Sequence, residues 1–288
     1  VSFLVFFLAR QLGDPLVLML GEYSTEHDRE LMAAALGLDK PFMVQYQIFL
    51  GNALHGDFGT SLRGGRPALE LVLERFPATA ELAVAGLLIA LIIGVPVGVY
   101  AAVKRGTVID MVARVFAICG QSIPIYWLGL MLILVFAVWL RLLPSAGRGG
   151  LEHLILPALT MGYYVVAGVM RLVRSSMLDV LSTEYIKFTR IKGLSERLVI
   201  WKHALRNAAI PVLTYVVMLF VMLLAGAVLT EVVFGWPGVG RLLMSSVQHR
   251  DFPVIQTVVI LLSGFYLGAN LIVDLLYAYL NPKIRFQR

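Results

Sequence analysis

The sequence predicts an all-α membrane protein built from long apolar helices. Apolar residues make up 59% of the 288-residue chain and charged residues only 15%, whereas soluble domains contain about 45–50% apolar residues. The apolar residues form long continuous runs, and about 20 such residues cross a hydrocarbon core at 1.5 Å per residue. Strands of a membrane barrel would instead alternate over about ten residues, so helices are predicted.

We expect six spans. The apolar residues 1–8 are interpreted as the end of a first span whose upstream half precedes the sequence as given. Residues 9–78 carry more acidic than basic side chains and are assigned to a region outside the membrane. The remaining spans are predicted at 79–103, 112–140, 154–173, 208–233 and 253–280, with Pro124 inside one of them.

Basic residues predict the orientation of these spans. More than half of the 24 Lys and Arg residues lie in three short segments, beside Lys104, around Lys187 and after Lys283. Basic residues collect in cytoplasmic loops, so these three segments are placed in the cytoplasm. Both termini are then expected to be cytoplasmic, and residues 9–78 to be periplasmic.

The most informative loop lies between the fourth and fifth predicted spans. This loop covers residues 184–214. Just before it, Thr183 or Ser182 can cap a first short helix, and Gly193 can end that helix in the left-handed conformation. Ser195, followed by Glu196, can start a second helix. A rigid basic projection of this kind suits docking onto a soluble partner. The alternative is an ordinary cytoplasmic loop.

Several functions are excluded by what the sequence lacks. No segment reads as a Gly-x-x-x-x-Gly-Lys-Ser/Thr phosphate loop, the five histidines have no metal-ligand spacing, and no Ser, His and Asp set is arranged for catalysis. We therefore expect no enzyme activity, no bound metal and no cofactor on this chain. The formal charge of +6 follows the loops rather than a patch, so no nucleic acid is expected. Cys119 is expected to be a small buried hydrophobe.

Few ionisable residues fall within the predicted spans. Glu81 and Arg114 lie near span ends, Glu231 lies at the outer end of the fifth span, and Asp274 lies in the sixth. Charges inside a membrane are costly, and ion-coupled carriers keep them because they use them. The scarcity argues against an ion-coupled secondary carrier, which remains the alternative from a different class. Asp274 is expected either to pair with a basic residue or to meet the transport pathway.

Several ordered motifs resemble one transporter family along nearly the whole chain. They are HGDFGTS at 55–61, RFPAT at 75–79, GVPVG at 94–98, MLDVL at 177–181, RIKGLS at 190–195, HALRNA at 203–208, PGVG at 237–240, Arg250-Asp251 and NPKIR at 281–285. Together they resemble the permease subunit of the dipeptide, oligopeptide and nickel branch of ABC importers. The chain departs from the broader importer signature, because Lys187-Phe188-Thr189 stands where Glu-Ala-Ala is usual.

The resemblance implies a type I ABC importer transmembrane domain of six spans over residues 1–288, with the first span truncated. It implies partners: a second homologous permease subunit in a heterodimer, two ATP-binding subunits that carry ATP and Mg, and an external substrate-binding protein. The expected location is the lipid bilayer of a prokaryotic inner membrane. The expected cargo is di- or oligopeptides, with nickel chelates or glutathione as the alternative.

The resemblance also implies roles for single residues. Residues 174–207 would be the coupling loop, in which Ile191 and Leu194 enter an ATPase groove and Arg206 with Asn207 braces the base. The docking residues are Glu184, Arg190, Ile191, Lys192, Gly193, Leu194, Ser195, Arg197, His203 and Arg206. The expected pathway residues are Gln121, Ser122, Tyr266, Asn270 and Asp274, although each could instead serve helix packing. The turn at Trp236, Pro237 and Gly238 is expected to meet the binding protein, or to be a plain rigid turn.

Overall fold

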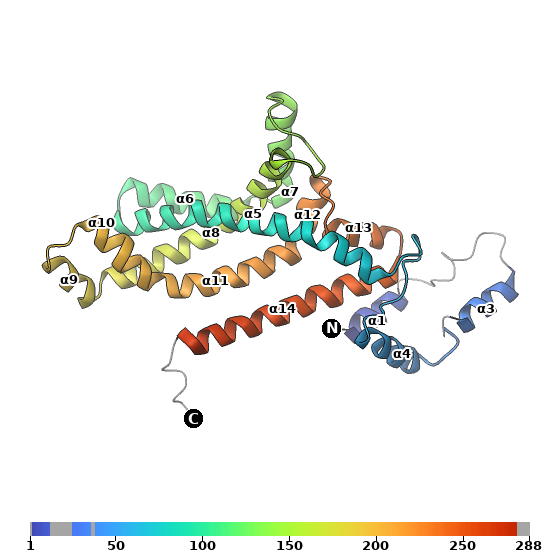
Figure 1. Ribbon diagram of the computed structural model, residues 1–288. Helices are drawn as coiled ribbons and strands as arrows, with labels where there is room; N and C mark the ends of the chain where they lie inside the picture. Colours follow the sequence, from blue (N-terminus) through green and yellow to red (C-terminus); the bar gives the residue numbers. More distant parts are fainter. Residues whose placement is uncertain (1, 12–24, 36–37, 281–288) are drawn as a thin grey trace. The chain divides into compact units, whose positions relative to one another are not determined.

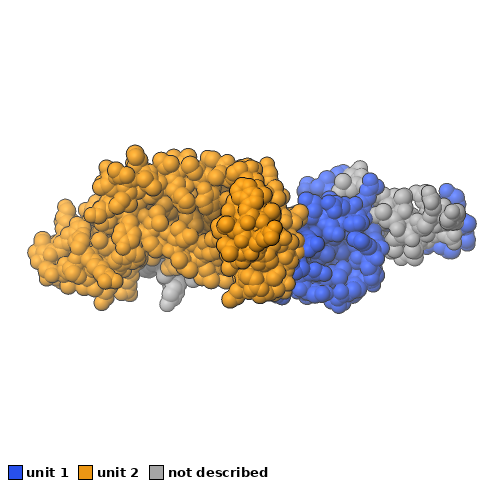
Figure 2. All heavy atoms as spheres, turned by 90° about the horizontal axis from the view of Figure 1, so that it is seen from above, with its two compact units in different colours: residues 1–79, 237–265 blue, residues 80–236, 266–288 orange. Residues whose placement is uncertain are grey.

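Helices joined by turns and loops make up the part of the chain described by the computed structural model, which covers residues 2–11, 25–35 and 38–280 (Figure 1). In these residues the β-structure is limited to one isolated bridge between Thr60 and Pro67. The chain forms two compact units (Figure 2). Unit 1 comprises Val1–Thr79 with Pro237–Phe265, and unit 2 comprises Ala80–Trp236 with Tyr266–Arg288.

Unit 1 has an aromatic cluster near the N-terminus. Helix α1 (Ser2–Gln11) places Phe6 within 5.2–5.6 Å, between ring centroids, of Phe42, Tyr46 and Phe49 on α4 (Phe42–Leu54). The side chain of Phe6 is buried. The predicted span end at 1–8 therefore lies in a helix that packs against α4. Helix α3 (Glu26–Ala35) lies between α1 and α4 in the sequence.

A second apolar cluster of unit 1 joins segments far apart in the sequence. It contains Ala68 and Val72 from the start of α5 (Ala68–Val103), Val239 from α13 (Val239–Gln248), and Val254 and Val258 from α14 (Phe252–Leu280). These side chains are almost fully buried. Their burial stabilises unit 1 by removing apolar surface from water.

Unit 2 holds most of the helices. Besides the remainder of α5 and α14, they are α6 (Val108–Ser122), α7 (Ile125–Leu132), the π-helical η1 (Ile133–Trp139), α8 (Leu151–Leu181), α9 (Glu184–Ile191), α10 (Glu196–Leu198), the π-helical η2 (Val199–Ala204), α11 (Leu205–Gly226) and α12 (Val228–Val233).

Helix α8 is the centre of unit 2. It packs against α6, α7 and α11, and about half of its length is buried. Helix α5 approaches it so closely that a Cβ at Gly98 would lie 2.7 Å from the Met170 carbonyl oxygen. Glycine in the GVPVG motif therefore lets two helix backbones meet, as small residues do in membrane helix pairs.

Four helices of the described residues are long and apolar enough to cross a membrane. The α6–α7 pair would add a fifth if it is one broken span, because its two parts are bent by 100°. Residues 112–140, predicted as one span, contain this bend. The bend lies at Ile123, whose backbone is extended (φ −84°, ψ 123°), because Pro124 disfavours a helical residue before it.

Three other features differ from expectation. Helix α8 continues to Leu181 rather than ending at 173, and the second helix of the loop is continuous with the next span, since residues 196–225 form one long helix. Cys119 is exposed rather than buried. It lies on α6, which packs against α8 through Ala113 and Ala117 instead.

Candidate functional site

The loop between α8 and α11 is built as a helix, a glycine turn and a second helix. Thr183 takes the N-cap position of α9, but its hydroxyl donates to the Val180 carbonyl (2.7 Å) rather than capping the helix. Gly193 has a φ of +74°, in the left-handed region, and its N–H donates to the Arg190 carbonyl (2.9 Å). Ser195 is extended and precedes α10. The glycine turn predicted from the sequence is present.

An ion pair closes this turn. Arg190 Nη2 lies 2.7 Å from Glu196 Oε1, and Arg190 Nε lies 3.2 Å from Glu196 Oε2. These hydrogen bonds raise the pKa of Arg190. Arg190 was predicted to contact a partner, but here it is engaged within the loop. Two parallel bonds fix an orientation that a single contact leaves free, so the pair holds α9 against α10.

A second contact joins α9 to η2. The Tyr185 hydroxyl and His203 Nδ1 are 2.7 Å apart. On the inner face of α9, Ile186 is fully buried, as are Val199 and Ala204 of η2. His203, predicted as a docking residue, thus fixes the position of α9. The Glu184 carboxylate accepts a hydrogen bond from Lys187 (2.8 Å) on the exposed side of the same helix.

The tip of the loop exposes apolar side chains. We define the exposed tip as Phe188, Ile191, Leu194 and Leu198, which are 63%, 79%, 36% and 36% exposed. Ile191 and Leu194 were predicted docking residues. Phe188 was not, although its spacing of three from Ile191 places both on one face of α9. Contiguous exposed apolar groups are typical of interaction sites, so the exposed tip is the candidate docking surface of this loop.

The other predicted loop residues surround this tip. Lys192, Ser195, Arg197 and Arg206 are exposed. The Asn207 side-chain amide donates to the His203 carbonyl (2.9 Å), one turn earlier. This bond stays within one continuous helix, and Arg206 is exposed beside it, so the bracing of the loop base by Arg206 and Asn207 stays a prediction.

The predicted pathway residues bond within their own helices. Ser122 Oγ donates to the Ile118 carbonyl (2.9 Å), and Asn270 Nδ2 donates to the Tyr266 carbonyl (3.0 Å). Gln121 and Tyr266 are exposed. The side chain of Asp274 lies outside the described part of the structure. The hydrogen bonds of Ser122 and Asn270 satisfy polar groups within apolar helices. A pathway role for these residues and for the exposed Gln121 and Tyr266 stays a prediction.

The predicted outer turn contains a buried indole. Trp236 is 1% exposed, and the Arg148 guanidinium lies 5.8 Å from its ring centroid. Arg148 also binds Glu81, with Nε 3.0 Å from Oε2. Gly238 is buried, and Pro237 is half-buried. Within unit 2, the segment of residues 141–150 is therefore fastened to α5 and to Trp236.

Comparisons with known proteins identify the family. A model of the binding-protein-dependent transport system inner membrane component matches residues 94–286. The chain belongs to this family. It is therefore a membrane-embedded transport component rather than an enzyme, as predicted. The family match favours this assignment over the alternative of an ion-coupled secondary carrier. No group of three or more His, Cys, Asp or Glu residues that could hold a metal ion occurs within the described segments.

Two curated relatives of this permease cover almost its whole length. The dipeptide transport system permease protein DppB of Escherichia coli K12 is 41% identical over 96% of this chain and 91% of its own. The glutathione transport system permease protein GsiC of the same strain is 43% identical over 100% of this chain and 94% of the GsiC chain. Both are permeases of the predicted type.

Solved structures of ABC transporters share the permease fold. The inward-facing MetNI methionine ABC transporter matches 74% of this chain and 97% of its own, with a TM-score of 0.59 and 20% identity. An amino acid ABC transporter solved with histidines matches 73% of this chain and 94% of the transporter chain, with a TM-score of 0.53 and 15% identity. The predicted type I importer fold is confirmed by this likeness.

Proposed function

We propose that this permease forms one half of an ATP-driven pathway that imports di- or oligopeptides across a prokaryotic inner membrane. Support comes from the near full-length similarity to a dipeptide permease. A second homologous permease subunit completes the pathway, and an external substrate-binding protein delivers cargo near Trp236, Pro237 and Gly238. The termini and residues 174–207 face the cytoplasm. Gln121, Ser122, Tyr266, Asn270 and Asp274 face the cargo.

The exposed tip on a stiffened loop is the observation on which this proposal rests. Two ATP-binding subunits hold ATP and Mg and dock on this loop, with Ile191 and its apolar neighbours entering a groove on one of them. This chain binds neither ATP nor Mg. Closure and reopening of the ATP-binding subunits then move α9, and the spans change between inward- and outward-facing states.

A second cargo is favoured by one specific observation. The glutathione permease is 43% identical over the whole chain, slightly more than the dipeptide permease. Glutathione is itself a tripeptide derivative, so the same machine could take it. Uptake by vesicles containing the full complex, with labelled dipeptide competed by unlabelled glutathione and by nickel, separates these cargoes.

Purification in mild detergent tests the docking proposal. The wild-type permease is expected to carry two ATP-binding subunits and one sister permease. Ile191→Asp places a charge on the exposed tip and is expected to lose the ATP-binding subunits while keeping the sister. Leu54→Asp is the matched control, because Leu54 is 80% exposed but lies at the end of α4. Equal recovery of ATP-binding subunits with Ile191→Asp and wild type would contradict the proposal.

A further inference from the structure

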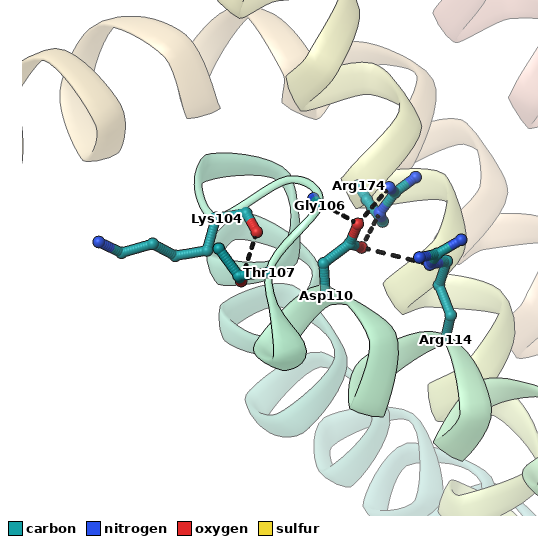
Figure 3. A network of polar contacts seen from close by, with 6 residues as sticks. All are labelled: Lys104, Gly106, Thr107, Asp110, Arg114 and Arg174. Atoms are coloured by element: carbon teal, nitrogen blue, oxygen red, sulfur yellow. Dashed lines mark hydrogen bonds and ion pairs between the residues drawn. The ribbon is translucent and has the colours of Figure 1, made fainter.

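A buried carboxylate ties α8 to the turn between α5 and α6. Asp110 lies in the first turn of α6, with a side chain only 2% exposed. Arg174 of α8 contacts it with two nitrogens, Nε at 2.7 Å from Oδ1 and Nη2 at 2.9 Å from Oδ2 (Figure 3). The backbone N–H of Gly106, in the turn, donates to Oδ2 at 3.1 Å. One carboxylate therefore joins two helices and a turn.

The contact is more restrictive than the other ion pairs nearby. Arg114, one turn along α6, approaches Asp110 at 3.6 Å with a side chain that is 54% exposed. Thr107 Oγ1 donates to the Lys104 carbonyl at 2.6 Å, so the turn is itself held in place. A bidentate Arg–carboxylate pair fixes both distance and orientation. Rotation of α8 about its axis would break at least one of the two bonds.

The position of Arg174 relates this contact to the coupling loop. Helix α8 continues from Arg174 to Leu181, a length of about 10 Å at 1.5 Å per residue. Only Ser182 and Thr183 separate its end from α9. Asp110 itself lies in another helix and is not a docking residue. A displacement of α9 reaches α11 through the contacts of Tyr185 and Arg190, and it reaches α8 through Ser182 and Thr183. Asp110 holds the α8 side of this connection.

We propose that Asp110 is a positioning residue that acts through Arg174 to make α8 and the α5–α6 turn move as one body with the coupling loop. The inference rests on the proposed docking of ATP-binding subunits. When the contact is intact, motion of α9 is carried into the spans. When it is broken, the end of α8 turns independently, and ATP hydrolysis continues without matched transport.

The first test measures coupling in vesicles that hold the complete importer with its binding protein. Asp110→Asn keeps the shape but removes the charge, and Arg174→Lys keeps the charge but removes the two-nitrogen fork. Both are expected to lower cargo taken up per ATP hydrolysed by at least about fivefold, within the usual range of coupling between sites. Asp110→Glu should restore part of the ratio. Arg114→Gln is the matched control, and the ratio should stay within about twofold because Arg114 is 54% exposed and approaches Asp110 only at 3.6 Å.

A second measurement needs no cargo. In a Cys119→Ser background, spin labels at Arg105→Cys and Asp179→Cys report the distance between the turn and the end of α8; both positions are exposed. In the protein with Asp110 and Arg174 intact, this distance should be the same with and without trapped ATP. In Asp110→Asn and in Arg174→Lys, the distance should differ between the two states.

The outcomes separate this inference from the proposed function. If ATP-binding subunits do not co-purify with the wild type, the proposed function fails. If they do, and both variants keep the wild-type uptake ratio and a constant distance, the role of Asp110 is overturned while the docking proposal stands. Loss of folding in Asp110→Asn leaves Arg174→Lys, which retains both charges, to decide.

Discussion

Ser61 and Asp251 are 190 positions apart, yet the Ser61 hydroxyl donates a hydrogen bond of 2.5 Å to the Asp251 carboxylate. The N–H of Leu62 donates to the other carboxylate oxygen at 3.1 Å. Both side chains are buried in unit 1. Two motifs that the sequence shows only as separate pieces, HGDFGTS and Arg250-Asp251, thus meet at one site. This contact explains physically why the two motifs carry these polar residues: Ser61 and Leu62 supply the donors that Asp251 accepts.

Removing this contact should loosen unit 1. Asp251→Asn removes the charge that two donors face, and a hydrogen bond to a charged group contributes about 1.5–3 kcal/mol. We expect a lower unfolding temperature in detergent and faster protease cleavage within residues 59–66. Asp57→Asn is the control, since Asp57 is exposed and bonds only locally to the Gly59 N–H. An unchanged cleavage rate in Asp251→Asn would contradict the assignment.

The Arg190–Glu196 pair should contribute stiffness more than stability. Its side chains are 43% and 55% exposed, and exposed pairs are typically worth about 0.2–1 kcal/mol. Glu196→Gln is therefore expected to leave the unfolding temperature almost unchanged while amide exchange over residues 184–198 becomes a few-fold faster. Lys187→Gln breaks the exposed pair with Glu184 and serves as control. Equal exchange rates in the two variants would remove the stiffening role.

Gly193 should tolerate only residues that accept a left-handed backbone. Apart from Gly193 and its two chain neighbours, no residue has an atom within 4 Å of a Cβ added there, so the limitation is φ of +74° and not space. Gly193→Ala should cost about 1–2 kcal/mol of local conformational energy, and Gly193→Pro should be worse because proline is fixed near φ −65°. Recovery of ATP-binding subunits should fall in the order Gly, Asn, Ala, Pro. Recovery independent of the residue would contradict the role of the turn.

Close approach of α5 and α8 should make Gly98 intolerant of any side chain. A Cβ there would meet the Met170 carbonyl at 2.7 Å and Val173 Cβ at 2.9 Å. Gly98→Ala must displace backbone, which costs about 1–3 kcal/mol. Gly264→Ala, in α14, is the matched control because, outside the adjacent residues and backbone of its own helix, no atom lies within 4 Å of its Cβ position. Thermal unfolding of both variants in detergent measures the difference, and equal unfolding temperatures would contradict the close packing.

Much of the site could be predicted because its signals are local. The left-handed Gly193, the helix before it and the extended Ser195 follow from the preferences of neighbouring residues, and all are present. The partner of Arg190 could not be predicted, since an exposed Arg six residues from a Glu has many possible contacts. Phe188 lies outside the RIKGLS motif, and only its helical spacing of three residues from Ile191 indicates that it shares the exposed face.

Contacts between residues far apart in the sequence could not be predicted from local sequence patterns. Asp110 lies just before the span predicted at 112–140, and nothing in the order of residues indicates that Arg174, 64 positions later, binds it. Trp236 was predicted to lie at an interaction surface, yet it is buried beside Arg148. Burial and pairing depend on how helices approach one another, which is set by packing over the whole unit.

By itself, the sequence determined the helical membrane class, the glycine turn at Gly193 and the family, because apolar run length, backbone preference and motif order are properties of the chain in one dimension. Only the tertiary structure decided the 100° bend between α6 and α7, the fastening of α8 by Asp110 and the contact between Ser61 and Asp251. The physical reason is that hydrogen bonds and packing act over a few ångströms of space, whatever number of residues separates the partners.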